Sequence, residues 1–442
     1  MKILVVDNEA GNGQLSFIMR AQDDGHTVRW YFSKPLDWKA KPVGKGIATI
    51  VADWRDHVRW ADLIVLGDNT KHLDQMDALR RQGRKIIGAT QASAAWELDR
   101  TVGQQIFRKH GIPVPAYREF SNYDQAIAYV KREGRPFVSK PNGDTDDKAL
   151  SYVAKSPADM IYQLQKWKGG HKHKDAFILQ EKVSGVEMAV GAWVGSNGFT
   201  AGWLENFETK KLFAGDLGPN TGEMGTTIKH VGRSRLAEKV LKPLEDAIVA
   251  TGHTGYVDVN TIVDEDGTPW PLEFTMRFGY PTWPIQQALI DGDIAEWLMD
   301  LTDGRDAKPW SRETAVGVVM ATGSFPHGRI PHADIVGIPI YGAEDVLDDL
   351  HFAEVQLGKA PLDVGGKVVD SPCFLTAGDY ILTATGRGAS VVEARYRAYS
   401  VLGKLSLPSS PFWRNDIGLK LKTCLPRLAD LGYAKAWRYA KA

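Results

Sequence analysis

The chain has 442 residues, too many for a single hydrophobic core, which predicts two to four domains. Lys plus Arg and Asp plus Glu number 54 each, so no overall basic field indicates nucleic acid as a partner. Only two cysteines are present, which excludes a disulfide scaffold and a cysteine-rich metal site. No apolar run approaches the roughly 20 residues of a membrane span, so we expect a cytoplasmic protein with no membrane partner.

The first hundred residues alternate apolar strands with helical stretches. The predicted strands lie at residues 3–7, 27–32, 61–67 and 85–88, with helices at 15–22 and 76–82. This alternation predicts a parallel, doubly wound sheet in a Rossmann-like domain over residues 1–103. The turn Gly11-Asn12-Gly13 has two interpretations, an ordinary strand–helix turn or a phosphate site at a helix N-terminus.

Residues 104–310 predict a second domain, with a lid subdomain at about 116–190. It contains a helix at 104–115, strands at 136–141, 177–181 and 188–194, and a hairpin of strands 255–263 and 269–274. The basic stretch Lys166–Lys174 holds two histidines, which we interpret as a solvated loop rather than a metal site.

The remaining chain predicts a small α+β domain over residues 311–425. Its short β-like runs, at 316–322, 352–357 and 380–385, precede a helical stretch at 390–402. Residues 426–442 are basic and aromatic, which predicts a docked or loose terminal extension.

Two segments carry chemistry rather than core packing. Gly215–Gly225 reads Gly-Asp-Leu-Gly-Pro-Asn-Thr-Gly-Glu-Met-Gly, so its backbone can come close to a ligand. In Leu272–Gly279, Glu273 ends an apolar strand and Arg277 follows four residues on, which suits a metal–phosphate site. Together these segments predict an enzyme that handles a nucleotide and an anionic intermediate.

Joining a carboxylate to an amine with ATP sets chemical requirements that the chain meets in a sensible order. Lysines must neutralise phosphates, oxygen ligands must hold Mg²⁺ (or Mn²⁺), and a cation must stabilise an acyl phosphate. The candidates, in chain order, are Lys140, Lys148, Gln180-Glu181-Lys182-Val183, Glu187, Glu273 and Arg277.

That order resembles the ATP-grasp superfamily, and in particular the glycinamide ribonucleotide synthetases (phosphoribosylamine–glycine ligases). The resemblance covers nearly the whole chain and is sharpest at Asp216–Gly225, which carries the family's Gly-Pro-Asn-Thr-Gly-x-Met-Gly signature. It implies a mixed α/β and α+β fold: a doubly wound N-terminal domain, a two-lobed nucleotide-binding core and a small C-terminal domain. It also implies an ADP-forming ligase, a monomer or homodimer, that uses ATP, Mg²⁺ or Mn²⁺, and small-molecule carboxylate and amine substrates.

The resemblance assigns roles to individual residues. Those assigned to ATP binding are Lys140, Lys148, the adenine hinge Gln180, Glu181, Lys182 and Val183, and the ribose-binding Glu187. Glu273 matches a magnesium ligand, and Arg277 and Lys148 are the expected catalytic residues. The expected substrate contacts are Gly13, Asp216, Pro219, Asn220, Thr221, Gly222, Met224, Arg277, Tyr280 and Trp283.

The chain also departs from the family's pattern. The loop 143–148 carries three acids where the family has glycine and alanine, and acids repel triphosphate oxygens. The family's second magnesium ligand, an asparagine, is Thr275 here, which leaves Asn260 or Asp258 as alternative oxygen ligands. After Gly279 the family's Asp-Pro-Glu-Thr-Gln is replaced by residues 280–284, Tyr-Pro-Thr-Trp-Pro.

These departures cluster on the acceptor side, which predicts an altered amine or acid substrate, with Tyr280 and Trp283 suited to a larger or flatter one. Alternatively, both aromatics pack against the core and the chain is a genuine phosphoribosylamine–glycine ligase of purine biosynthesis. A third hypothesis is a catalytically silent nucleotide-binding protein of the same fold. An NAD-type oxidoreductase is disfavoured, because the turn at 11–13 lacks the Gly-x-Gly-x-x-Gly spacing.

Overall fold

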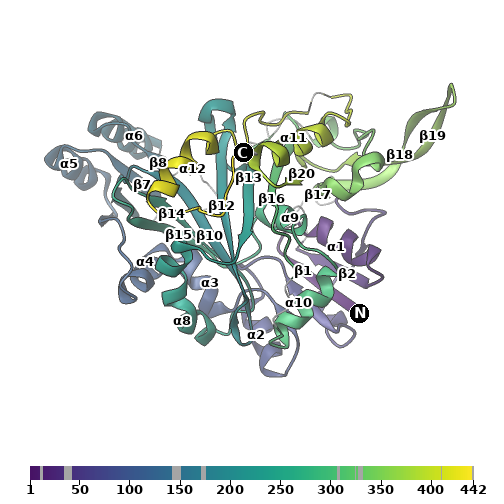
Figure 1. Ribbon diagram of the computed structural model, residues 1–442, viewed down its shortest axis with the longest axis horizontal. Coiled ribbons are helices and arrows are strands. Elements are labelled where there is room, and N and C mark those ends of the chain that lie inside the picture. Colours follow the sequence, from purple (N-terminus) through teal and green to yellow (C-terminus); the bar gives the residue numbers. More distant parts are fainter. Residues whose placement is uncertain are drawn as a thin grey trace.

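The computed structural model describes residues 1–9, 13–33, 42–141, 151–170, 176–305, 309–323, 325–326, 332–409 and 411–440. These residues build a small parallel sheet, a lid sheet and a large antiparallel sheet, with one hairpin that projects from the body (Figure 1).

The N-terminal sheet is parallel, with strand order β3-β2-β1-β4-β5. Its strands are β1 (Lys2–Asp7), β2 (Thr27–Phe32), β3 (Thr49–Ile50), β4 (Leu63–Leu66) and β5 (Ile86–Ile87). The helices of this region are α1 (Gln14–Asp23), α2 (Leu73–Arg81) and α3 (Gln91–Leu98), with a short 3₁₀ turn, η2 (Trp54–His57). Ile3 to Val6 are fully buried, as expected for a strand covered on both faces. The predicted doubly wound sheet is confirmed.

The lid sheet has the order β6-β9-β7-β8. Its strands are β6 (Tyr117–Phe120), β7 (Phe137–Pro141), β8 (Tyr152–Val153) and β9 (Phe177–Glu181). Helix α4 (Arg100–Lys109) precedes it, and α5 (Tyr123–Glu133) and α6 (Pro157–Gly170) form its outer end at the upper left of Figure 1. Phe137, Phe177, Leu179 and Trp167 form a separate apolar core, so the lid is a packed unit of its own.

The large sheet has the order β15-β14-β10-β12-β13-β16-β20-β17. Its strands are β10 (Val186–Gly195), β12 (Trp203–Phe213), β13 (Leu217–Val231), β14 (Gly255–Val263), β15 (Pro269–Thr275), β16 (Thr314–Ala321), β17 (Leu350–Phe352) and β20 (Tyr380–Gly388), with β11 (Gly198–Phe199) beside β10. Strand β16 pairs with β13 from Gly225 to Lys229, so the sheet continues across residue 310. The division into domains at 310/311 stays a prediction.

Helices and a hairpin complete the fold. The helices are α7 (Arg235–Val240), α8 (Glu245–Ala250), α9 (Thr282–Gln287), α10 (Ile294–Thr302), α11 (Val391–Leu402) and α12 (Leu421–Asp430), and the 3₁₀ turns are η4 (Ala214–Asp216), η5 (Lys242–Leu244), η6 (His332–Asp334) and η7 (Glu344–Asp349). The single strand expected at 352–357 is divided, since β17 ends at Phe352 and the projecting hairpin of β18 (Val355–Val364) and β19 (Lys367–Thr376) follows (Figure 1).

The C-terminal residues dock on the body. Tyr433 and Trp437 are buried, and the Trp437 indole donates to Glu205 at 2.7 Å. Of the two interpretations of this extension, the docked one holds as far as residue 440. None of the described helices is long and apolar enough to cross a bilayer.

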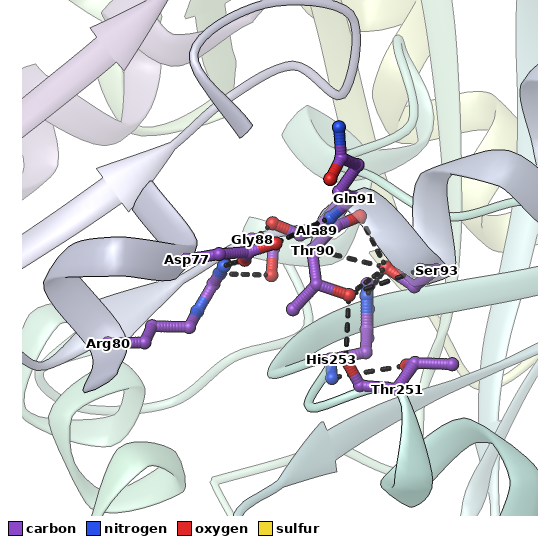
Figure 2. Close-up of polar contacts among 9 residues, drawn as sticks. All are labelled: Asp77, Arg80, Gly88, Ala89, Thr90, Gln91, Ser93, Thr251 and His253. Carbon is purple, nitrogen blue, oxygen red and sulfur yellow. Dashed lines mark hydrogen bonds and ion pairs between the residues drawn. The ribbon is translucent and has the colours of Figure 1, made fainter. Parts of the chain in front are cut away.

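A polar contact joins the parallel sheet to the large sheet (Figure 2). The Thr90 hydroxyl accepts from Ser93 N–H at 3.1 Å, which caps α3, and donates to the Thr251 carbonyl at 2.8 Å. Gly88 N–H donates to the Thr254 carbonyl at 2.6 Å. Strand β14 begins directly after Thr254. It is therefore anchored to the end of the N-terminal sheet by the Gly88 backbone and the Thr90 side chain.

His253 lies inside this contact, 2% exposed, between the Ser93 hydroxyl at 3.0 Å and the Tyr256 carbonyl at 3.1 Å. Burial lowers the pKa of His253 to about 4. An unfolded histidine titrates near pH 6.5, so between pH 6.5 and 4 the unfolded chain binds the additional proton. The stabilisation is present above pH 6.5 and is lost as the pH falls through this window.

We therefore expect the free energy of unfolding to decrease by about 3 kcal/mol more in the wild type than in His253→Gln between pH 6.5 and 4. Urea unfolding across this pH range measures the difference between the two proteins. Equal pH slopes for both would contradict a neutral, buried His253.

Candidate active site

The connection between the lid sheet and the large sheet runs from β9 to β10. Gln180 and Glu181 end β9, Lys182 and Val183 follow, and Glu187 is the second residue of β10. Gln180 is 2% exposed, and Lys182 donates to the Ala154 carbonyl at 3.2 Å. The expected hinge residues thus form the link between the two lobes.

Lys140 lies on the same face of the lid sheet as Gln180. In the β7–β9 pairing it stands opposite Ile178, and residues two apart on a strand share a face. Burial lowers the pKa of Lys140 to about 7; the positive charges of Arg100 and Lys210 lower it further, and Glu273 and Glu187 oppose the shift. These four groups come from α4 and the large sheet, so Lys140 lies within electrostatic range of the charged residues of the other lobe.

Lys210 of β12 gathers the carboxylates of the large sheet. Its ammonium nitrogen lies 3.1 Å from Glu187, 3.1 Å from Glu208 and 3.9 Å from Glu273. Burial lowers the pKa of Lys210, but the three carboxylates outweigh burial and raise it well above its ordinary value. Lys210 is therefore a permanent cation at the centre of an acidic cluster.

Two further cations border this cluster. Arg100, the first residue of α4, lies 3.2 Å from the second oxygen of Glu273. Burial raises the pKa of Glu187, but Lys210 and then Lys420 reverse the effect, so the pKa lies below its ordinary value. The Lys420 ammonium donates to the Glu208 carbonyl at 2.6 Å. Arg100, Lys210 and Lys420 thus contact residues of this cluster, and the charge of Lys140 acts on it as well.

The oxygen ligands expected for a divalent cation lie on two paired strands. Asn260 of β14 is the direct cross-strand neighbour of Glu273 on β15, and Thr275 stands opposite Asp258 on the same face. The Asn260 amide nitrogen donates to both Glu208 oxygens at 3.1 Å, while its buried Oδ1 has no hydrogen-bond partner among the described residues. Amide and carboxylate oxygens are ligands that Mg²⁺ accepts, so Asn260 and Glu273 fit such an ion.

The protein alone supplies only part of a coordination shell. Within the described ranges, no three His, Cys, Asp or Glu side chains are grouped to hold a metal. Phosphate oxygens and water would complete the six ligands that Mg²⁺ requires.

Asp258 lies on this same face, 3% exposed, and accepts from the Tyr256 hydroxyl and the Asn206 amide, both at 2.8 Å. Burial and the neighbouring Glu208 raise the pKa of Asp258 to about 7. Both contacts use Asp258 Oδ2, and Asp258 Oδ1, like Asn260 Oδ1, has no partner among the described residues. Asn260, and not Asp258, stands directly opposite Glu273, which favours Asn260 as the second ligand.

Arg277 is held by Glu97 of α3. The two side chains are 2.9 Å apart, and a Glu97 oxygen also accepts from Met276 N–H at 2.6 Å. Glu97, more than the opposing effect of burial, raises the pKa of Arg277, and Asp68 and Glu273 add to it. Arg277 thus stands between the acidic cluster of the large sheet and the end of the parallel sheet.

The signature segment, residues 216–225, includes the exposed tip of the β12–β13 hairpin and the buried base that follows it. At the tip, Asp216 is exposed and pairs with Arg414 at 3.0 Å. Thr221 is buried at the base, and its hydroxyl donates to the Lys210 carbonyl at 2.9 Å. Of the other residues in this segment that were predicted to contact substrate, Asn220 and Gly222 are exposed, Pro219 is half-buried and Met224 is fully buried. The segment therefore positions Lys210 and is itself held by the C-terminal part of the chain.

The two aromatic residues expected on the acceptor side, Trp283 and Tyr280, lie in different parts of the fold. Trp283 is 1% exposed in the core, against Phe278 and Trp193, which agrees with the alternative that it packs internally. Tyr280 lies over Gly13 at the start of α1, where an added Cβ would be 2.5 Å from the Tyr280 ring. Lys148 and the acidic loop 143–148 fall outside the described residues, as do Gly11 and Asn12.

Sequence reasoning missed Lys210, Glu208, Arg100 and Glu97. The signal for the first two is the placement of polar residues at every second position of β12, since Asn206, Glu208 and Lys210 share one face of the strand. Arg100 and Glu97 lie on helices next to the parallel sheet, and no local pattern connects them to residues 270–280.

Comparisons with known proteins agree with this geometry. Residues 99–282 match the family model described as phosphoribosylglycinamide synthetase, ATP-grasp (A) domain. Phosphoribosylamine–glycine ligase of Salmonella typhimurium is 29% identical over 372 residues, 81% of this chain and 83% of that protein. The ligase of the same name from Neisseria meningitidis is 29% identical over 362 residues, 78% of this chain and 81% of that protein.

Solved structures share the fold. The crystal structure of phosphoribosylamine–glycine ligase from Thermotoga maritima has a TM-score of 0.71 at 20% identity and covers 95% of this chain and 100% of that one. An L-amino acid ligase from Bacillus licheniformis has a TM-score of 0.58 at 16% identity, with 93% and 99% covered.

The ion pairs of Lys210 predict that its substitution destabilises the protein more than substitution of the neighbouring Lys211. Lys210→Met leaves Glu187, Glu208 and Glu273 without their shared cation, so we expect the free energy of unfolding to fall by about 1–3 kcal/mol. Lys211→Met is the matched control, because its ammonium contacts only the Gly218 carbonyl at 3.3 Å among the bonds of the described residues. Chemical denaturation at pH 7.5 measures both variants; equal losses would contradict a special role for Lys210.

Proposed function

We propose that this chain, an ATP-grasp ligase that resembles glycinamide ribonucleotide synthetase, activates a small carboxylate with ATP and joins it to an amine other than phosphoribosylamine. The observation that carries the proposal is the convergence of Lys140 from the lid with Lys210, Glu187 and Glu273 from the large sheet. Such a cleft between two lobes suits a triphosphate whose terminal phosphoryl group is transferred.

The residues of the cleft divide the work of nucleotide binding. Lys140, Arg100 and Lys210 offset phosphate charge, and the hinge from Gln180 to Val183 offers backbone groups to adenine. Glu187, held as an anion by Lys210, accepts from the ribose hydroxyls. Mg²⁺ or Mn²⁺, when bound, supplies additional screening between the phosphates, and Glu273 and Asn260 are the residues that would hold it.

Arg277 is the residue we assign to the reacting groups. Phosphoryl transfer to the carboxylate yields ADP and an acyl phosphate, and attack by the amine forms the C–N bond and releases phosphate. Both steps develop negative charge on oxygen, which a fixed cation stabilises. Glu97 fixes the orientation of the Arg277 guanidinium, so little reorganisation is needed when that charge appears.

The acceptor side supports a changed substrate. The N-terminus of a helix is a ready phosphate site, but at α1 the Tyr280 ring packs directly over Gly13. Trp283 is in the core and does not enter the proposal as a substrate contact. The proposed substrates remain small molecules, a carboxylate and an amine, and the monomer or homodimer in the cytoplasm stays a prediction.

Substitution of the phosphate and metal residues tests the assignment. We expect Lys140→Ala and Glu273→Ala each to reduce substrate-dependent ADP release at least about 100-fold, because each removes a charge that acts on the transferring phosphoryl group. A coupled ADP assay with a panel of carboxylates and amines measures the rates.

Exposed residues of the same type supply the controls, Lys155→Ala on the lid and Glu265→Ala at the hairpin turn, the latter 85% exposed. Full turnover by both site variants would refute the site. Thermal stabilisation of the wild type by Mg²⁺-ATP without ADP release from any pair would favour the catalytically silent alternative.

A further inference from the structure

The order of the parallel sheet places a topological switch point at the carboxyl ends of β1 and β4, and we call the group of residues there the crevice. The chain leaves β1 toward β2 on one side, whereas β4 lies on the other side of β1. In open parallel sheets, ligands bind outside the carboxyl ends of the strands at such a switch point. Here those ends carry Asp7 and Asn8 after β1, and Asp68 and Asn69 after β4.

The side chains at this point are buried and incompletely bonded. Asp7 is 1% exposed, Gln14 1% and Asn69 0%. Asp7 Oδ1, Asn8 Oδ1, Asn69 Oδ1 and both polar atoms of Gln14 have no hydrogen-bond partner among the described residues. Each such atom destabilises the protein by about 1–3 kcal/mol, so a cluster of them indicates a group that is still to be bound.

The unpartnered atoms belong to one neighbourhood. A Cβ added to Gly67 would overlap the Asp7 carboxylate and lie 3.0 Å from the Gln14 side chain. The Asn8 amide donates to Thr70 at 2.8 Å, and Thr70 N–H donates to Asp68 at 2.7 Å. The crevice is thus a connected set from β1, α1 and the β4 loop.

The hydrogen-bond pattern fixes which atoms remain for a ligand. The Asn8 and Asn69 amide nitrogens already donate, the latter to Glu97 at 2.8 Å, which leaves their carbonyl oxygens. Trp30 donates to one Asp7 oxygen at 2.9 Å and leaves the other. Four acceptor oxygens therefore remain, counting Gln14 Oε1, beside one donor, the Gln14 amide nitrogen. An ammonium group has three donors and no acceptor, so it matches the three oxygens of Asp7, Asn8 and Asn69.

The surrounding charge has the sign that suits a cation. Asp7 and Asp68 repel one another, and burial raises the pKa of Asp7 well above its ordinary value, with Asp68 adding to it. Arg277, on whose pKa the charge of Asp68 acts, is already paired with Glu97. A phosphate placed beside these carboxylates would be repelled, whereas an ammonium ion would relieve their desolvation.

We propose that this crevice binds the amine substrate as an organic ammonium ion without a phosphate group, held by Asp7, Asn8 and Asn69. The inference rests on the proposed ligase function and narrows its acceptor to a class. The contact from Asn69 through Glu97 to Arg277 connects the crevice to the residue assigned to the reacting groups, which places the amine next to the acyl phosphate.

The test compares matched amines on the full chain. ADP release with Mg²⁺-ATP and a panel of carboxylates is measured with the amino acids, with ethanolamine and with O-phosphoethanolamine, which differs from ethanolamine only by its phosphate. We expect unphosphorylated amines to support turnover, and the phosphate to reduce kcat/KM at least tenfold. A preference for phosphorylated amines would overturn the inference.

Variants test the residues. Asp7→Asn and Asn8→Ala are each expected to raise the KM for the amine at least tenfold, and two variants guard against a folding defect in one of them. Asp23→Asn, an exposed carboxylate of α1, is the control and keeps the wild-type KM. An unchanged amine KM in both crevice variants means that the buried atoms bind only ordered water, which overturns the inference.

Hydroxylamine separates this inference from the function on which it rests, because it captures an acyl phosphate as a hydroxamate without a specific amine site. Hydroxamate formation by the wild type together with a preference for phosphorylated amines overturns the inference alone. The absence of both hydroxamate and stabilisation by Mg²⁺-ATP overturns the ligase function, and the inference with it.

Discussion

The site depends on one half-buried cation shared by three carboxylates. Lys210 holds Glu187, Glu208 and Glu273, which come from β10, β12 and β15 and would otherwise repel each other across neighbouring strands. In the sheet order β15-β14-β10-β12, β12 is the outermost of the three strands, so the Lys210 side chain reaches across β10 toward β15 and holds carboxylates from all three. The Thr221 contact to the Lys210 carbonyl explains why the signature segment follows directly in the chain.

The nucleotide side and the acceptor side of the proposed site differ in how closely they match the family that the chain resembles. On the proposed nucleotide side, Lys140 is on β7, Gln180 ends β9 and Glu273 is on β15 opposite Asn260. Their roles in nucleotide and metal binding stay predictions. On the acceptor side, Tyr280 covers the start of α1, and acids line the switch point of the parallel sheet. In our proposal the nucleotide residues and the acceptor residues belong to different sheets, so acceptor recognition can change while nucleotide binding is kept.

Much of the fold could be predicted from the sequence. Apolar periodicity located β1, β2, β9 and β14 to within a residue, because buried strands impose a local pattern. The extension of the large sheet into β16 could not be predicted, since pairing between distant strands leaves no local signal. For the site, linear motifs predicted Glu187 and Glu273, but Lys210 acts through partners on other strands. The place of Trp283 in the core depended on the packing of Phe278 and Trp193 around it.

The most direct test is a crystal structure of the wild-type chain with Mg²⁺ and a non-hydrolysable ATP analogue. The account predicts the terminal phosphate between Lys140 and Lys210, with the metal on Glu273 and Asn260. An analogue bound outside the junction of the lid and large sheets, or Lys140 and Glu273 directed into separate cavities, would contradict it.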